Sequence, residues 1–171
     1  MSFNNILIIG GSGFIGSYLS KELSNSGFNV TILDKVDNNE FPFIQADIKN
    51  PNQLNKINSS FDLLIHLAAE HQDDIQPISK YYDTNVEGTR NIIQFCDSNN
   101  IKNFIFFSTQ AVYGDSKEKY SEEDSPNPSN HYGKSKYLAE KLLLDWKKED
   151  CKLAIIRPSA VFGNGSIGNF N

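Results

Sequence analysis

Short apolar runs rich in β-branched and aromatic residues alternate along the chain with longer segments of mixed polarity. Several runs are hydrophobic almost without interruption, as is typical of strands covered on both faces. Strands that alternate with helical segments indicate a parallel sheet joined by crossover helices. The pattern therefore predicts an α/β fold with a doubly wound parallel sheet and helices on both faces. The predicted strands are residues 5–9, 29–33, 43–46, 61–67, 103–107 and 152–156.

Helical spacing of apolar residues is clearest directly after the first strand. The stripe there comprises Ile15, Tyr18, Leu19 and Leu23, which predicts an amphipathic helix over 14–25. Gly27 is expected to end this helix in the left-handed conformation that glycine adopts easily. A later stripe of Leu138, Leu142 and Trp146 predicts another helix, and the charged, proline-containing stretch 117–130 before it is interpreted as a surface loop.

Length and composition indicate one soluble globular domain. The chain has 171 residues, of which 39% are hydrophobic and 22% charged, and a formal net charge of −5. This charge argues against a nucleic-acid partner, because phosphate contacts need clustered lysines and arginines. No apolar run reaches the length of a membrane span or a signal-peptide core, so we expect a cytoplasmic protein without a membrane partner.

The cysteines and histidines do not suggest a metal site. Cys96 and Cys151 lie in neither metal-ligand nor redox-motif spacing, so both are predicted to be small core residues. His71, with Asp73 and Asp74 close behind it, is interpreted as part of a polar loop. We therefore expect no bound metal.

A glycine-rich turn joins the first predicted strand to the first predicted helix. In this turn, Gly11, Gly13 and Gly16 satisfy G-x-G-x-x-G, while Gly10, Gly13 and Gly16 satisfy G-x-x-G-x-x-G. In either frame, bare backbone can approach a pyrophosphate at the helix N-terminus. The alternative is a tight turn without a ligand. A Gly-Lys-Ser/Thr sequence does not follow, which argues against a nucleoside-triphosphate P-loop.

Two acidic residues follow the next two strands. Asp34 comes 18 residues after Gly16, where a carboxylate can accept hydrogen bonds from the adenosine ribose. Its charge would repel a 2′-phosphate and so favours NAD over NADP, although the neighbouring Lys35 weakens this preference. Asp47 could contact the adenine edge. The alternatives are a surface residue for Asp34 and a helix N-terminal residue for Asp47.

The glycine turn and Asp34 also fit a methyltransferase that binds S-adenosylmethionine, so a second group of residues must decide. Tyr132 and Lys136 are four residues apart, which places a phenol and an ammonium on one face of a helix. A nearby Lys⁺ and an oxidised nicotinamide both favour the phenolate, so Tyr132 could exchange a proton with a carbinol or carbonyl. The preceding strand ends in Ser108 and Thr109, whose hydroxyls could bind the same substrate oxygen.

Together these residues resemble the extended short-chain dehydrogenase/reductases, in particular the NAD-dependent nucleotide-sugar epimerases and dehydratases. The resemblance runs from residue 6 to residue 165 and implies a Rossmann-type sheet. It rests on residues 10–16, 34, 47–48, 66–69, 85–89, 108–114, 132–136, 157–158 and 161–163.

The resemblance implies roles for individual residues. Tyr132 would be the catalytic acid/base and Lys136 the partner that lowers its pKa and holds the nicotinamide ribose. Thr109 would be the catalytic hydroxyl, with Ser108 as the neighbouring candidate. His66 is given no catalytic role, and Ser159 is expected near the nicotinamide. The implied cofactor-binding residues are Gly10, Gly13, Phe14, Ile15, Gly16, Asp34, Asp47, Ile48, Leu67, Ala68, Ala69, Asn85, Tyr132, Lys136 and Pro158. For Asn85, an exposed helical residue is the alternative.

The residues after Thr109 favour one chemistry of the family. Dehydratases resemble one another in carrying Asp-Glu there, whereas this chain has Gln110 and Ala111, which cannot transfer protons. The resemblance therefore implies an NAD-dependent epimerase acting at C4 of a UDP- or GDP-sugar through a 4-keto intermediate. A 4-keto-sugar reductase or a dehydratase of the same family and a non-catalytic NAD(H)-binding module remain alternatives. A homodimer is also implied.

In this family the substrate domain is built mostly from residues beyond the sixth strand. Residues 1–171 are therefore expected to form the NAD-binding Rossmann domain with the catalytic residues, without the C-terminal substrate domain, as in a truncated chain. Remote binding energy to the nucleotide positions the sugar, so activity of these residues alone is not expected.

Overall fold

The computed structural model describes residues 4–37, 40–116 and 119–163. Six described strands form one parallel sheet with the order β3-β2-β1-β4-β5-β6. This order reverses direction between β1 and β4, which is the arrangement of a doubly wound sheet with its ligand site at the switch point. The strands are β1 (Asn5–Ile9), β2 (Asn29–Asp34), β3 (Phe43–Gln45), β4 (Leu63–His66), β5 (Asn103–Phe107) and β6 (Lys152–Ile156).

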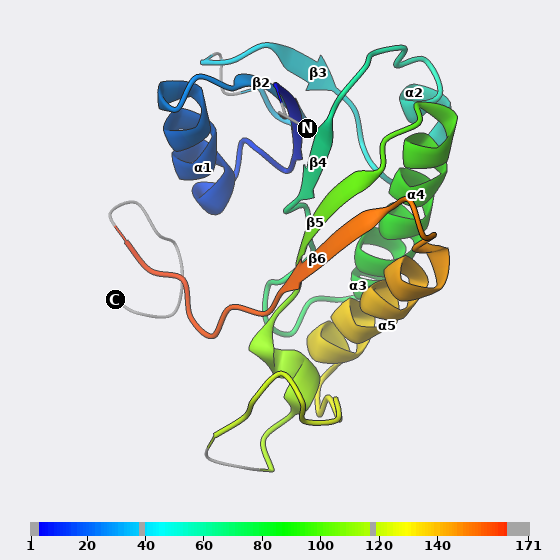
Figure 1. The fold of residues 1–171 in the computed structure, drawn as a ribbon. Helices are drawn as coiled ribbons and strands as arrows, with labels where there is room; N and C mark the ends of the chain where they lie inside the picture. Colours follow the sequence, from blue (N-terminus) through cyan, green and yellow to red (C-terminus); the bar gives the residue numbers. More distant parts are fainter. Residues whose placement is uncertain (1–3, 38–39, 117–118, 164–171) are drawn as a thin grey trace.

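Helices cover both faces of the sheet, as predicted. In Figure 1, α1 lies on one side and α2, α4 and α5 lie on the other. The α-helices are α1 (Phe14–Asn25), α2 (Pro51–Leu54), α3 (Ser79–Tyr82), α4 (Gly88–Ser98) and α5 (His131–Trp146). A π-helical turn, η1 (Asp83–Glu87), joins α3 to α4, and a 3-10 turn, η2 (Gln110–Tyr113), follows β5.

Alternating side chains of β1 enter two hydrophobic cores. Ile6 and Ile8 lie in the core beneath α1, whereas Leu7 and Ile9 lie in the larger core beneath the other helices. Both sets are almost fully buried. The continuous hydrophobicity of this run therefore has the predicted cause, because each face of the strand contacts a separate core.

Most strand boundaries agree with the sequence prediction, but β4 is shorter than the predicted 61–67. At its start, the carboxylate of Asp62 accepts hydrogen bonds from the backbone N–H groups of Asn4 and Asn5. At its end, the N–H groups of Leu67 and Ala68 both donate to the carbonyl of Ile9. Regular pairing of β4 with β1 therefore ends at the pair of His66 and Ile9, where one carbonyl accepts two N–H groups.

The first predicted helix has the predicted bounds, and Gly27 ends it with φ +89°. Tyr18 does not join the buried stripe, because half of its surface is exposed and its ring meets Phe14 edge-on.

On α5 the buried side of the helix differs from the predicted stripe. Leu138 is 40% exposed, and the fully buried side passes through Lys136, Ala139, Glu140 and Leu143. Of the predicted loop 117–130, residues 119–130 contain neither helix nor strand, and 117 and 118 lie outside the described residues.

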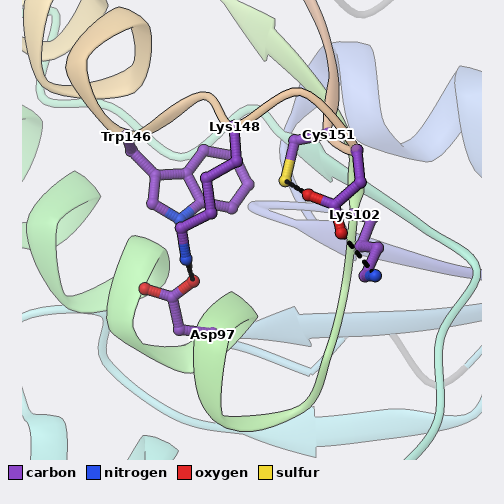
Figure 2. Close-up of polar contacts among 6 residues, drawn as sticks. Asp97, Lys102, Trp146, Lys148 and Cys151 are labelled. Carbon is purple, nitrogen blue, oxygen red and sulfur yellow. Dashed lines mark hydrogen bonds and ion pairs between the residues drawn. The ribbon is translucent and has the colours of Figure 1, made fainter.

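A polar cluster closes the amino edge of the sheet, opposite the strand ends that carry the candidate residues (Figure 2). Trp146 Nε1 and Lys148 Nζ each lie 3.0 Å from Asp97 Oδ1, and Lys102 Nζ lies 2.6 Å from Asp150 Oδ2. Cys96 and Cys151 are both buried free thiols, which confirms their prediction as core residues.

Candidate active site

The candidate residues follow the carboxyl ends of β1, β4 and β5, which are neighbours in the sheet. Residues 10–16 follow β1, residues 67–69 follow β4, and Ser108 and Thr109 follow β5. The topology therefore brings together segments that are about a hundred residues apart in sequence, at the position where doubly wound sheets bind ligands.

The glycines of the first turn have different structural requirements. Gly10 has φ +79°, and a Cβ there would lie 2.5 Å from the backbone nitrogen of Ala68. A Cβ on Gly16 would lie 2.5 Å from Gly11 Cα. The absence of a side chain at Gly16 therefore allows the start of the helix to contact the turn closely. A Cβ on Gly13 would meet only the carbonyl of Gly10, at 3.4 Å. Gly13 is therefore the position where a side chain would fill space that the fold itself does not use.

The N-terminus of α1 suits a dinucleotide. Gly13 is the N-cap and provides no side-chain acceptor, so the first backbone N–H groups of the helix, starting with Phe14 and Ile15, remain for an anionic group. The turn and the helix start therefore fit the pyrophosphate expected from the sequence.

Asp34 is bonded to the glycine turn and is not an isolated surface residue. Its Oδ2 accepts the N–H of Ser12 at 3.1 Å, and its Oδ1 accepts the N–H of Lys35 at 2.6 Å. Asp47 lies in the turn that precedes α2, where its Oδ1 accepts the N–H of Lys49 at 2.9 Å. Ile48 is different, because its side chain is buried against Gly88. Both carboxylates thus lie at the ligand-binding edge of the sheet, while the Ile48 side chain belongs to the core.

Tyr132 and Thr109 are brought together from different elements. Asn130 caps α5 by accepting the N–H of Gly133 at 2.7 Å, which places Tyr132 in the first turn of the helix. A hydrogen bond with the Thr109 side chain acts to lower the pKa of Tyr132, but burial has the larger effect and raises it. Ser108 has a buried hydroxyl without a hydrogen-bond partner among the described residues. The contact with Tyr132 distinguishes Thr109 from Ser108.

Lys136 is enclosed one turn after Tyr132. Its side chain is 1% exposed, and its Nζ lies 4.1 Å from the centre of the Phe106 ring. Burial lowers its pKa from 10.5 to about 7, while the charge of Glu140 acts in the opposite direction. Burial therefore opposes both the phenolate form of Tyr132 and the ammonium form of Lys136.

Asn85 lies in the π-helical turn and is almost fully buried, so the alternative of an exposed helical residue is wrong. Its amide donates to the carbonyl of Glu70 at 2.9 Å and accepts the N–H of the same residue at 2.8 Å. It also donates to the hydroxyl of Ser135 at 2.8 Å, and this hydroxyl donates to the carbonyl of Tyr132. Asn85 therefore fixes the segment after β4 against the first turn of α5.

His66 is a core residue, as expected. Its Nε2 lies 3.2 Å from Thr89 Oγ1, and burial lowers its pKa from 6.5 to about 3. The partly buried residues 67–69 continue from it towards the glycine turn. Across the sheet, the carbonyl of Pro158 accepts the N–H of Gln110, and Ser159 is exposed.

The sequence prediction missed one buried ion pair. Arg157 binds Glu140 through two hydrogen bonds, and Glu140 is fully buried. The spacing of Tyr132, Lys136 and Glu140 at intervals of four residues was the available signal, since it places all three on one helix face.

The fold, the glycine turn and the pair of Tyr132 and Lys136 define a Rossmann-type dinucleotide-binding domain. Within the described residues, no helix is both long and apolar enough to cross a membrane, and no cluster of His, Cys, Asp and Glu could hold a metal ion. Residues 6–171 match the sequence model of the NAD dependent epimerase/dehydratase family. The chain belongs to this family.

Similar proteins include several 4-epimerases. The chain is 42% identical to the N-acetyl-alpha-D-glucosaminyl-diphospho-ditrans,octacis-undecaprenol 4-epimerase of Escherichia coli O157:H7, over 97% of this chain and 51% of that protein. It is 34% identical to the UDP-glucose 4-epimerase of Lactobacillus helveticus, over 95% of this chain and 54% of that protein. The chain thus spans about half the length of the curated relatives it matches.

Solved structures agree with the fold. The UDP-glucose 4-epimerase of Brucella ovis, in complex with NAD, matches with a TM-score of 0.82 and 30% identity, over 90% of this chain and 51% of that one. The UDP-Glc/GlcNAc 4-epimerase of Campylobacter jejuni matches with the same TM-score and 28% identity, over 90% of this chain and 53% of that one. The expectations of an NAD-dependent family and a Rossmann-type sheet are confirmed.

Proposed function

We propose that the protein containing this chain is an NAD-dependent 4-epimerase of a hexose attached to a diphosphate. The main support is the meeting of Thr109 and Tyr132 at the same carboxyl edge of the sheet as the glycine turn. When bound, NAD supplies reversible hydride acceptance at the sugar C4. In this proposal NAD is held by Gly10, Gly13, Phe14, Ile15, Gly16, Asp34, Asp47, Ile48, Leu67, Ala68, Ala69, Asn85, Tyr132, Lys136 and Pro158, with Ile48 contributing through its backbone and Asn85 through the Glu70 segment that it fixes.

The chain's own side chains handle the proton. Tyr132 takes the proton of the C4 hydroxyl during oxidation and returns it during reduction of the 4-keto sugar. Thr109 holds the same sugar oxygen through its hydroxyl. Lys136 contributes positive charge one helical turn away, which favours the phenolate of Tyr132 over the phenol.

Gln110 and Ala111 support epimerisation over dehydration. The backbone N–H of Gln110 is bonded to the carbonyl of Pro158, which fixes the turn after Thr109. Neither an amide nor a methyl side chain can transfer the protons that elimination of water requires. The same turn could serve a 4-keto-sugar reductase, which consumes the reduced cofactor instead of regenerating it.

A nucleoside diphosphate is the carrier expected from the sequence, and a polyprenyl diphosphate is the second candidate. The chain is 42% identical to the relative whose name gives an undecaprenyl-diphosphate sugar as substrate. It is 34% identical to the UDP-glucose 4-epimerase of Lactobacillus helveticus. Both carriers present a hexose through a diphosphate, so the same proton transfer at C4 serves either of them.

The full-length protein is the right material for the test. Purified protein would be incubated with UDP-glucose, UDP-GlcNAc, a GDP-hexose or GlcNAc-diphospho-undecaprenol, and the C4 epimers would be separated by chromatography. We expect interconversion without net NADH formation in at least one case, and none with Tyr132→Phe. Stoichiometric formation of NADH from added NAD⁺, which is the reverse reaction of a 4-keto-sugar reductase, would identify a reductase, and a dehydrated product a dehydratase. NAD binding without turnover of any substrate would favour the binding-module alternative.

Calorimetry with NAD and S-adenosylmethionine tests the cofactor separately, and the family match favours NAD.

The homodimer is tested by sedimentation of the same full-length protein. Leu138 and Leu144 of α5, which are 40% and 55% exposed, are the apolar side chains that we propose for such a contact.

A further inference from the structure

One face of α5 carries a phenol, an ammonium and a carboxylate in succession. Tyr132, Lys136 and Glu140 are each four residues apart, which stacks them on one side of the helix. Lys136 is 1% exposed and Glu140 is fully buried. Buried charges of this kind are costly unless they are paired, so the arrangement needs a specific reason.

Glu140 is held in place by a second charge. Arg157 donates from Nε to Glu140 Oε1 at 3.0 Å and from Nη2 to Oε2 at 2.7 Å, which is a two-point contact between a planar fork and a carboxylate. The third nitrogen of Arg157, Nη1, donates to the Tyr113 hydroxyl at 2.6 Å. The Arg157 fork therefore fixes the position of the Glu140 carboxylate.

The other surroundings of Lys136 offer little compensation for its charge. β5 presents the ring of Phe106, and β4 presents His66, whose lowered pKa keeps it neutral. The π-helical turn presents the uncharged Asn85, while its acidic residues, Asp83 and Glu87, are exposed. The turn after β5 presents the phenol of Tyr113, which is bonded to Arg157. Glu140 is the carboxylate whose charge raises the pKa of Lys136 against the effect of burial.

We propose that Glu140, held by Arg157, is a positioning residue that supplies the counter-charge to the ammonium of Lys136. The inference rests on the proposed function, in which this ammonium favours the phenolate of Tyr132. Without a counter-charge, a buried amine releases its proton and no longer stabilises a neighbouring anion. Arg157 contributes indirectly, because its two hydrogen bonds prevent the carboxylate from turning away.

The test is a titration of Lys136 in the full-length protein without cofactor or substrate. The lysine side chains would be labelled with ¹³C at Cε and followed by NMR, with Lys136→Arg used to assign the signal. In Glu140→Gln, which keeps the shape and removes the charge, we expect the midpoint of Lys136 to fall by about one pH unit or more, a tenfold change in proton affinity. The matched control is Asp145→Asn, which removes an exposed carboxylate from the same helix and should leave the midpoint unchanged.

An unchanged midpoint in folded Glu140→Gln would overturn the proposal. If Glu140→Gln does not fold, Glu140→Asp replaces it, because a carboxylate withdrawn by one methylene should still lower the midpoint by part of that amount. A wild-type midpoint in Glu140→Asp would then count against the proposal. Because the titration needs no turnover, a shifted midpoint in a protein without epimerase activity would support the charge pairing and reject the proposed function.

A kinetic measurement then separates this effect from simple loss of packing. If the protein is an active epimerase, Glu140→Gln should move the alkaline limb of its kcat profile to lower pH, with KM little changed. Glu140→Asp should restore part of that shift. A uniform loss of kcat at every pH would indicate a structural role only.

Discussion

The amide of Asn85 donates a hydrogen bond to the hydroxyl of Ser135 over 2.8 Å, and this hydroxyl donates in turn to the carbonyl of Tyr132. The contact joins the π-helical turn to the first turn of α5. π-Helical turns are rare and are often found at functional sites. Here the turn directs a buried amide between two segments that both face the candidate site.

Asn85→Ala is expected to destabilise the fold. It leaves both part-buried backbone groups of Glu70 without their partner and removes the bond that the Ser135 hydroxyl accepts. An unpaired buried polar group costs about 1–3 kcal/mol. We expect the free energy of unfolding in urea to fall by about 2 kcal/mol or more. Asn52→Ala, at an exposed position of α2, is the control and should change it by less than about 0.5 kcal/mol. Equal stability of the two variants would show that the bridge contributes nothing.

The glycine turn predicts opposite effects for two substitutions. Gly16→Ala places a methyl group 2.5 Å from the backbone of Gly11, so it should cost about 1–3 kcal/mol of stability or more. Gly13→Ala meets only the carbonyl of Gly10 at 3.4 Å and should fold normally, but it fills the approach to the helix N-terminus. Thermal unfolding and NAD calorimetry together separate the two. A Gly13→Ala variant with wild-type NAD affinity would contradict the proposed cofactor position.

Tyr132→Phe is expected to lower kcat of the full-length enzyme by about 10²–10⁴-fold, the usual range for loss of a positioned acid or base. NAD affinity should change much less, because the aromatic ring is retained. Tyr137→Phe, on the same helix, is the control for loss of a phenol outside the site. Parallel losses of kcat and NAD affinity in Tyr132→Phe would reject the assigned role.

Thr109→Val should produce a smaller loss than Tyr132→Phe, since it removes one hydrogen bond to the reacting oxygen and no proton carrier. The same substitution removes the contact that acts to lower the pKa of Tyr132. We therefore expect the acidic limb of the kcat profile to move to higher pH. Ser108→Ala is the comparison, and a larger effect there would exchange the roles of the two residues.

The burial of His66 predicts that the folded protein loses stability in acid. Its pKa is about 3 in the folded protein against 6.5 for the free side chain, so between these values the unfolded chain binds a proton that the folded chain does not. The free energy of unfolding should therefore fall as the pH drops from 6.5 towards 3, by at most about 1.4 kcal/mol per pH unit from this group. Urea titrations of wild type and His66→Gln should show a shallower dependence in the variant. An equal pH dependence in wild type and His66→Gln would contradict this prediction.

Much of the fold could be predicted because it depends on local patterns. Uninterrupted apolar runs identified the strands, and the glycines at 10–16 identified the turn that joins β1 to α1. The π-helical turn was not predictable in this way, since its geometry depends on the tertiary contacts of Asn85 with Glu70 and Ser135. The shortened β4 has the same kind of cause, because its pairing with β1 ends where Leu67 and Ala68 both donate to the carbonyl of Ile9.

The arrangement of the candidate residues on the fold could be predicted better than their charge states. Sequence spacing placed Tyr132 and Lys136 on one helix face, but it could not show that burial raises the pKa of the phenol and lowers that of the amine. These effects depend on what surrounds the helix after folding. The pairing of Glu140 with Arg157 was missed for a related reason, since polar residues on helices are normally expected to face water.

The cluster around Trp146 at the amino edge has a practical consequence. This residue is the single tryptophan of the chain, its indole bonds to Asp97, and its ring meets Phe104 edge-on at 5.9 Å. It lies fourteen residues along α5 from Tyr132, which corresponds to about 21 Å of helix. Indole fluorescence therefore reports on the packing of α5 against α4 and β5, away from the cofactor side. Unfolding can therefore be followed optically at that end of the molecule.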